Sequence, residues 1–243
     1  MPARQSFSAF RDTLGATPAT SEVHTRRAAA VDLAIVIAFM ASLNLTTLAV
    51  TERYAGPITA LCTVILITAL LRWHGMRWRN LGMRRPSHPW WLFAQVPVVL
   101  VAWLAASFGA ATLVGQYLQS PDISERFGHL ADNLASTVWW IAIGWLIGGF
   151  AEEMIFRGFF LNRLEVLLPR GTRGSVMAVL LQAFLFGTVH VYNRGLFGLL
   201  VLGTVGSVLG TFYLVFRRNL WPTILAHGLG NTLGFLARYL SPE

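Results

Sequence analysis

Five ionisable or amide side chains lie at helical spacings inside three otherwise apolar segments of the chain. Glu152 and Glu153 lie in the middle of one segment, His190 lies in the next, and His227 and Asn231 lie in the last. A carboxylate and a histidine can hold and deprotonate a water molecule. A second histidine and an amide can donate hydrogen bonds to a developing oxyanion. Together these groups suffice to hydrolyse an acyl bond such as a peptide, without a serine or cysteine nucleophile.

Distances along the chain indicate that three of these groups share one level. The polar connection 169–174 is a turn, and Glu152 lies 19 residues before its centre while His190 lies 19 residues after it. At the helical rise per residue, Glu152 is roughly 15 Å from the end of its segment. His227 follows Arg218 by nine residues, which corresponds to about 13 Å. We therefore expect Glu152, His190 and His227 to meet at one depth of a helical bundle.

The spacings also indicate which groups share a helix face. Glu153 and Arg157 are four residues apart, and so are His227 and Asn231, so each pair can lie on one face. Glu152 is turned about 100° from Glu153 on an α-helix, since one turn takes 3.6 residues. We expect Arg157 to hold Glu153 ionised and the two carboxylates to have different roles.

Two other interpretations of these residues remain open. Glu152, His190 and His227 are also ordinary ligands of a divalent metal such as zinc, and three of them leave a position for water. No His-Glu-x-x-His pair is present, so a metal-bound and a metal-free site are both compatible with the sequence. An inert buried polar network that fixes helix packing is the other interpretation.

The amino-acid composition indicates the class of protein to which these groups belong. Of the 243 residues, 55% are hydrophobic and only 12% are charged, and the mean hydropathy is +0.56. Soluble domains carry roughly 25% charged residues. Disordered, collagen-like and disulfide-rich chains are excluded by the apolar content and the single cysteine, Cys62. An integral membrane protein remains.

Seven apolar runs predict an all-α polytopic bundle of about seven transmembrane helices. A helix of about 20 apolar residues crosses a bilayer, and no alternation typical of β-strands is present. We expect residues 1–28 to form a disordered cytoplasmic tail and residues 29–243 a single transmembrane domain. The expected spans lie near 29–50, 57–72, 89–115, 135–157, 175–192, 195–216 and 220–239.

The basic residues predict the orientation in the membrane. All 19 of them are arginine, and they lie between the apolar runs rather than on one face, which argues against nucleic-acid binding. Arginine collects in the cytoplasmic segments of membrane proteins. Fourteen arginines fall on the side of the N-terminal tail and four on the opposite side. The sequence therefore predicts a multi-pass protein of the cytoplasmic membrane with the N-terminus inside and the C-terminus outside.

Other polar and small residues in the spans predict packing. Asp32 lies close to Arg26 and Arg27, so we expect an interfacial ion pair, and we expect Asn44 to make an interhelical hydrogen bond. Small residues at four-residue spacing allow helix backbones to approach closely. They predict tight contacts at three glycine pairs: Gly144 and Gly148, Gly206 and Gly210, Gly230 and Gly234.

The three polar segments, taken in order, resemble the CAAX proteases and bacteriocin-processing enzymes, also called the Abi family of intramembrane proteases. That family has the pattern Glu-Glu-x-x-x-Arg, then Phe-x-x-x-His, then His-x-x-x-Asn. The resemblance covers about residues 76–235, including the basic stretch 81–86 before the third span. The matching residues are Glu152, Glu153, Arg157, Phe186, His190, His227 and Asn231.

The resemblance implies an all-helical intramembrane endopeptidase whose site opens toward the cytosol and the lipid. It implies that Glu152 is the general base, assisted by His190. It also implies that His227 and Asn231 stabilise the oxyanion.

The supporting residues and the cofactor follow from the same resemblance. Glu153 and Arg157 would support the site, as would Phe186. The family is described both as metalloproteases and as metal-independent glutamate enzymes, so zinc and no metal both stay open. Expected partners are membrane lipid and a protein or peptide substrate, with no nucleic acid; the sequence gives no oligomeric state.

Relatives in the family differ in function, which leaves an alternative to proteolysis. Eukaryotic members remove the last three residues of prenylated proteins, whereas prokaryotic members include bacteriocin immunity proteins. The alternative function is therefore a non-catalytic membrane immunity or scaffold protein. A transporter is less favoured, because the outer halves of the motif segments are nearly bare of polar residues.

Overall fold

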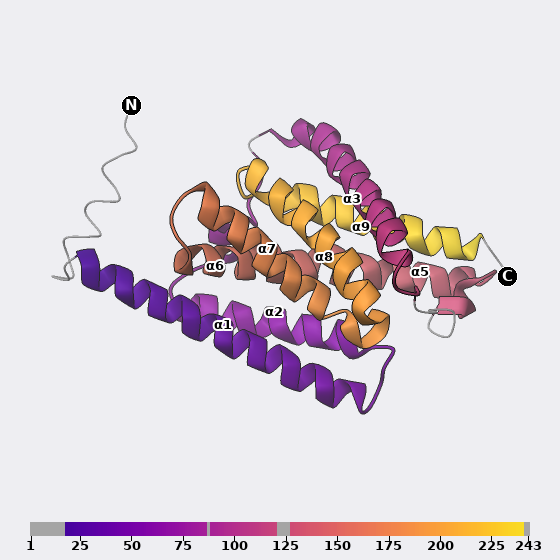
Figure 1. Ribbon diagram of the computed structural model, residues 1–243, viewed down its shortest axis with the longest axis horizontal. Coiled ribbons are helices and arrows are strands. Elements are labelled where there is room, and N and C mark those ends of the chain that lie inside the picture. The colour runs from indigo at the N-terminus through magenta and orange to yellow at the C-terminus, as the bar shows by residue number, and fades with distance from the viewer. Residues whose placement is uncertain (1–17, 87, 121–126, 241–243) are drawn as a thin grey trace.

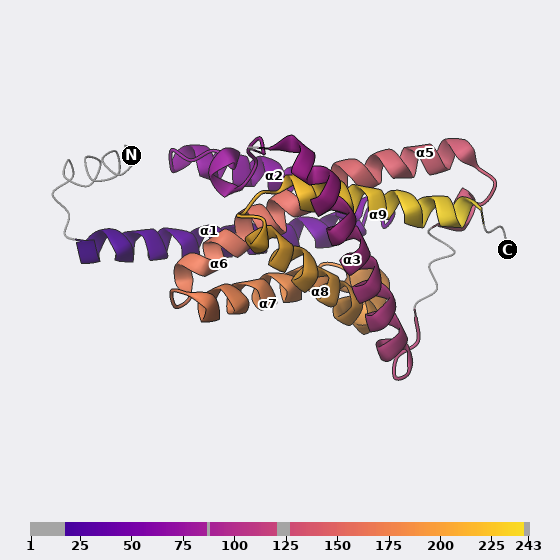
Figure 2. The same cartoon turned by 90° about the horizontal axis from the view of Figure 1, so that it is seen from above.

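The computed structural model consists of helices and describes residues 18–86, 88–120 and 127–240, with side chains from residue 25 onward. No β-strand occurs among these residues, so the predicted all-α polytopic bundle is confirmed. Long helices lie nearly along one direction, and α3 crosses the others obliquely (Figures 1 and 2). Each of the seven predicted apolar runs corresponds to one long helix.

The fourth run forms a continuous helix of four segments, α5, η4, η5 and α6, which we call the central helix.

Short 3₁₀ helices lie between the long ones: η1 (Trp78–Leu81), η2 (Pro89–Trp91) and η3 (Gly128–Leu130). The long elements are α1 (Pro18–Leu48), α2 (Ala55–Trp73), α3 (Leu92–Gly115), the central helix made of α5 (Leu134–Ile143), η4 (Gly144–Glu152), η5 (Met154–Leu161) and α6 (Asn162–Leu167), and then α7 (Thr172–Thr188), α8 (Val191–Val215) and α9 (Trp221–Tyr239).

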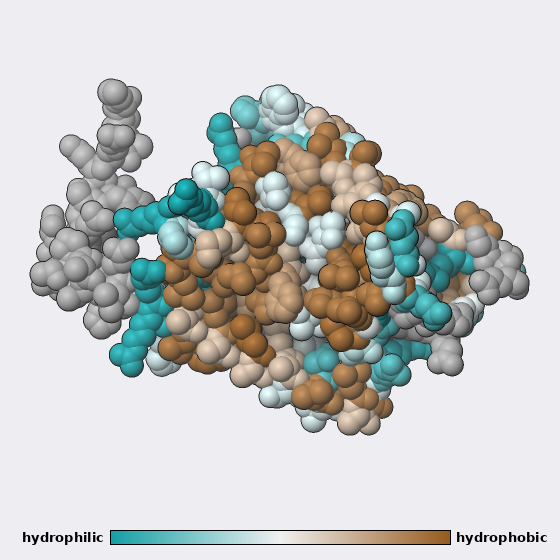
Figure 3. Space-filling model, viewed as in Figure 1, coloured by the Kyte–Doolittle hydropathy of each residue, from teal (hydrophilic) through white to brown (hydrophobic). Residues whose placement is uncertain are grey.

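Five of these helices are long and apolar enough to cross a membrane. They are Thr25–Leu48, Ala55–Trp73, Pro89–Gly115, Leu134–Leu167 and Val191–Val215. The other two are α7, which has only 17 residues, and α9, which contains a polar motif. Hydrophobic side chains cover the middle of the face that Figure 3 shows, and hydrophilic ones lie toward its ends.

Two predicted boundaries differ from the helices observed. α1 begins at Pro18, so the last part of the predicted tail 1–28 is helical, while residues 1–17 lie outside the described part of the chain. The boundary between the fifth and sixth predicted runs, at residues 192–195, is a kink near the start of α8. Gly195 there has φ +56°, a conformation that glycine adopts without steric cost.

Glycines allow the central helix and α9 to approach closely. Of the six glycines in the three predicted pairs, five make close contacts, but Gly234 faces open space, so the prediction is wrong there. A Cβ atom added at Gly149 would lie 3.2 Å from the Cα of Gly228, and one at Gly148 would overlap the Asn231 amide. The segments η4 and η5 are π-helical, which the sequence did not predict. π-Helical turns are rare and are frequent at functional sites.

The predicted pairing of Asp32 with Arg26 or Arg27 is wrong. The buried Asp32 carboxylate instead lies 2.9 Å from Arg163 on α6 and 3.0 Å from His74, which follows α2. Residues five or six apart on a helix do not share a face, so neither arginine can reach Asp32 along α1. Arg26 donates instead to the carbonyl oxygen of Leu167. Asp32 therefore attaches α1 to both α2 and the central helix.

Replacing Asp32 by Asn should destabilise the fold, because it leaves the largely buried Arg163 without its counter-charge. Breaking a buried ion pair on one side costs about 3–5 kcal/mol, so the thermal unfolding temperature in detergent should fall by several degrees. Asp132→Asn is a matched control, since that carboxylate is exposed. Equal unfolding temperatures for the two variants would contradict the attachment of α1 by Asp32.

Candidate active site

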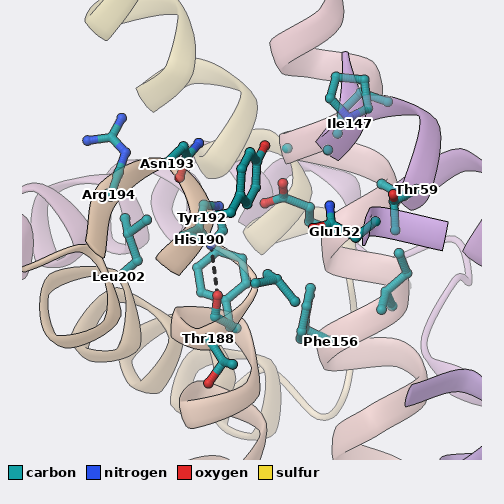
Figure 4. A pocket seen from close by; sticks show the side chains of 18 of the residues that line it. Thr59, Ile147, Glu152, Phe156, Thr188, His190, Tyr192, Asn193, Arg194 and Leu202 are labelled. Carbon is teal, nitrogen blue, oxygen red and sulfur yellow. Dashed lines mark hydrogen bonds between the residues drawn. The ribbon is translucent and has the colours of Figure 1, made fainter. Parts of the chain in front are cut away.

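The polar residues of the three motifs meet at one cavity of about 540 Å³. The central helix forms one wall, α1 and α2 form another, and α3, α7, α8 and α9 contribute further lining residues. Glu152, His190, His227 and Asn231 all line the cavity, and Figure 4 shows Glu152 and His190 at its sides. The structure thus brings the sequence-predicted residues together, as the chain distances to the turn 169–174 led us to expect.

The two adjacent glutamates differ in their access to this cavity. Glu152 lines it with a side chain that is 19% exposed, and its Oε2 lies 3.9 Å from Nε2 of His227. The side chain of Glu153 is fully buried and points into the bundle. Only Glu152 can therefore contact a substrate or a water molecule in the cavity.

Glu153 is held between two partners that also tie the motif helices together. Its Oε1 accepts hydrogen bonds from Arg157 Nη1 and from His227 Nδ1, each at 2.9 Å. The Arg157 guanidinium lies 4.5 Å from the centre of the Phe186 ring and 3.4 Å from the Gly206 carbonyl oxygen. The predicted pair of Glu153 and Arg157 is confirmed, and Phe186 packs against it.

These contacts determine which ring nitrogen of each histidine carries the hydrogen atom. An ionised carboxylate only accepts hydrogen bonds, so His227 donates from Nδ1 and turns Nε2 toward Glu152. His190 Nδ1 lies 2.8 Å from the carbonyl oxygen of Phe186, which also only accepts (Figure 4). A neutral His190 therefore keeps the lone pair on Nε2 for a proton.

Asn231 and Trp103 complete the surroundings of His227. The Asn231 amide donates one N–H to the carbonyl oxygen of Gly144 at 3.1 Å, which leaves its second N–H for another acceptor. The ring of Trp103, on α3, lies 5.3 Å from the His227 ring, centre to centre. Both side chains line the cavity.

Several lining residues were not predicted as part of the site. Trp103, Tyr192 and Arg194 line the cavity, and so does Asn44, which we expected to make an interhelical hydrogen bond. Arg194 lies four residues after His190, so this spacing could have indicated it. Trp103 and Asn44 are on helices distant in sequence from the motifs, and only the arrangement of the helices reveals them.

The predicted metal ligands do not form a metal-binding group. Among the residues that the structure describes, no three or more His, Cys, Asp and Glu side chains are arranged to hold a metal ion. His227 Nδ1 is already engaged by Glu153. The set Glu152, His190 and His227 thus offers no ready ligand geometry, and a bound divalent metal stays a prediction.

Comparison with known proteins finds one similarity, over the second half of the chain. The family model described as "Type II CAAX prenyl endopeptidase Rce1-like" matches residues 134–233, the stretch from α5 to α9 that contains all three motifs. No curated protein and no solved structure matches the chain. The match supports the resemblance seen in the motifs. The chain is an integral membrane protein, and its residues 134–233 are similar to the Rce1-like CAAX endopeptidases.

Proposed function

We propose that the protein is an intramembrane endopeptidase that hydrolyses a peptide bond of a membrane-associated or lipidated protein or peptide. One observation carries this proposal: of two adjacent glutamates, one lines a cavity beside two histidines and the other is sealed behind them. A polar network that served only helix packing would not require a carboxylate that lines a cavity inside the membrane, because a charged side chain there is costly.

Glu152 acts as the general base in the proposed reaction. A water molecule lies between the Glu152 carboxylate and Nε2 of His190, and Glu152 takes its proton as the oxygen attacks the peptide carbonyl carbon. The electron pair of the C=O bond moves onto the carbonyl oxygen, which becomes an oxyanion. When the C–N bond breaks, Glu152 returns the proton to the leaving amine, and the carbonyl re-forms as an acid.

His227 and Asn231 stabilise the oxyanion in this scheme. The second N–H of Asn231 and a protonated Nε2 of His227 are the available donors. The Glu153 carboxylate accepts the hydrogen bond from Nδ1 of His227 and fixes its ring, as a carboxylate does for the histidine of a catalytic triad. Arg157 and Phe186 act through Glu153 and are positioning residues. No step passes through a metal, and zinc remains a separate prediction.

Replacing Glu152 by Gln should abolish cleavage, because an amide cannot take the proton. Loss of a general base costs about 10²–10⁴-fold in rate. The measurement compares the peptide termini in membranes of cells that express the wild type or the variant at equal levels. Membranes with the wild type should contain termini that are absent from those with the variant. Glu52→Gln, at an exposed position in the α1–α2 connection, is the control and should cleave normally. Unchanged termini in all three, with the cellular phenotype preserved in Glu152→Gln, would favour the immunity or scaffold function instead.

The adjacent glutamate should behave differently. Glu153→Gln leaves Arg157 fully buried without a counter-charge, which costs on the order of 3 kcal/mol, whereas Glu152→Gln removes a carboxylate that has no such partner. We expect the unfolding temperature in detergent to fall for Glu153→Gln and to stay near the wild-type value for Glu152→Gln. The opposite order would show that the roles of the two carboxylates are reversed.

A further inference from the structure

The segment that joins α2 to α3 is basic and aromatic throughout. Residues 72–93, which we call the basic loop, run from the end of α2 to the start of α3 and contain five arginines, four tryptophans and no Asp or Glu. The segment therefore carries five positive charges from arginine and no negative one. All five arginines are exposed: Arg72, Arg77, Arg79, Arg84 and Arg85.

Large aromatic side chains flank these arginines and are exposed as well. Trp73 is 86% exposed, Trp90 is 63% exposed and Phe93 is 85% exposed. The basic loop joins two helices that are long and apolar enough to span a membrane, Ala55–Trp73 and Pro89–Gly115. Tryptophan is enriched where such helices leave the membrane, because its amphipathic ring fits the level of the lipid headgroups. The arginines of the basic loop therefore lie at the headgroup level.

Backbone contacts hold the basic loop against the bundle. The Leu220 N–H donates to the carbonyl oxygen of Gly82 at 3.1 Å, and the Tyr213 hydroxyl donates to that of Leu81 at 3.0 Å. A Cβ atom at Gly82 would overlap the carbonyl oxygen of Arg218, so the approach is as close as glycine allows. Because the backbone is already ordered, the arginines bind a ligand with little further loss of conformational entropy.

Two exposed arginines from different connections lie next to each other at this surface. Arg84 of the basic loop donates from Nη2 to the carbonyl oxygen of Arg217, between α8 and α9, at 2.6 Å. Neither guanidinium forms an ion pair with a carboxylate within the part of the chain that the structure describes. Two like charges are thus held close together, which favours the binding of an anion between them.

Neighbouring arginines have acidic partners instead. Arg218 donates to Glu165 at 2.9 Å, and Arg163 lies 2.9 Å from Asp32. The general enrichment of arginine in the connections on one side of a membrane does not require tryptophans beside the arginines. It also does not require two arginines in contact without a carboxylate. A ligand that supplies negative charge at the headgroup level accounts for both features.

We propose that the basic loop and Arg217 bind the headgroups of acidic phospholipids. The lipid phosphate accepts hydrogen bonds from the guanidinium groups of Arg84 and Arg217, which match phosphate oxygens in geometry. The exposed tryptophans hold the loop at the boundary between headgroups and acyl chains. Each arginine near an acidic membrane surface strengthens binding about fivefold. This inference does not depend on the proposed protease activity.

Thermal unfolding in defined lipids tests the proposal without any cleavage assay. The full chain, purified in a neutral detergent, is heated in micelles that contain either phosphatidylglycerol or phosphatidylcholine. Phosphatidylglycerol should raise the unfolding temperature by several degrees more than phosphatidylcholine, because a ligand that binds the folded state stabilises it. High salt should reduce the difference by screening the charges. Equal effects of the two lipids on the wild type would overturn the proposal.

Two double variants with the same loss of charge test the position of the site. Arg84→Gln with Arg217→Gln removes the adjacent pair, whereas Arg27→Gln with Arg173→Gln removes exposed arginines of α1 and α7. The phosphatidylglycerol concentration that gives half of the temperature rise should increase at least about tenfold for the first variant and stay within about twofold for the second. An equal change in both would indicate general attraction to charge and would overturn the site.

A third double variant covers the contact that Arg84 makes with the backbone. Arg79→Gln with Arg85→Gln removes exposed side chains that make no hydrogen bond or ion pair with described residues. Its unfolding temperature in phosphatidylcholine should equal that of the wild type, while it should require more phosphatidylglycerol. An unchanged requirement would contradict the proposal. Glycerol phosphate, which has no acyl chains, should stabilise the wild type far less than phosphatidylglycerol, and an equal effect would also contradict a lipid site.

Discussion

The arrangement of the site depends on one buried carboxylate that accepts hydrogen bonds from two side chains. Glu153 accepts from Arg157 on its own helix and from His227 on α9, both at 2.9 Å. A charge in this position is tolerated only when it is paired and hydrogen-bonded. The geometry that neutralises Glu153 therefore also fixes the distance between the central helix and α9. It orients His227 with Nε2 toward Glu152, so the position of the reactive groups follows from the need to bury a charge safely.

The contact requires close helix packing, which the glycines of both helices provide. Gly149 and Gly228 bring the backbones near enough for the side chain of Glu153 to span the gap to His227. Since successive residues on a helix point in different directions, the same backbone that turns Glu153 inward turns Glu152 to the cavity. Glu153 thereby stabilises the packing of the helices, while Glu152 stays accessible from the cavity.

The sequence predicts what depends on the geometry of single helices and short turns. The rise per residue is fixed, so equal distances along the chain from the turn 169–174 were enough to predict that Glu152 and His190 lie at the same cavity. Contacts between distant helices follow no such rule. Asp32 finds its partners 42 and 131 positions away, and Trp103 reaches His227 from α3. The π-helical form of η4 and η5 was also not predicted, because no residue pattern is specific for it.

The bundle places its polar groups in two different environments. Asp32 and Glu165 are paired with arginines across helices, so these charges hold the helices together. The wall of the cavity is largely apolar, and Glu152 lies in it with Nε2 of His227 at 3.9 Å. A substrate that fills the cavity strengthens every electrostatic contact at the oxyanion, because it displaces the water that would otherwise screen them.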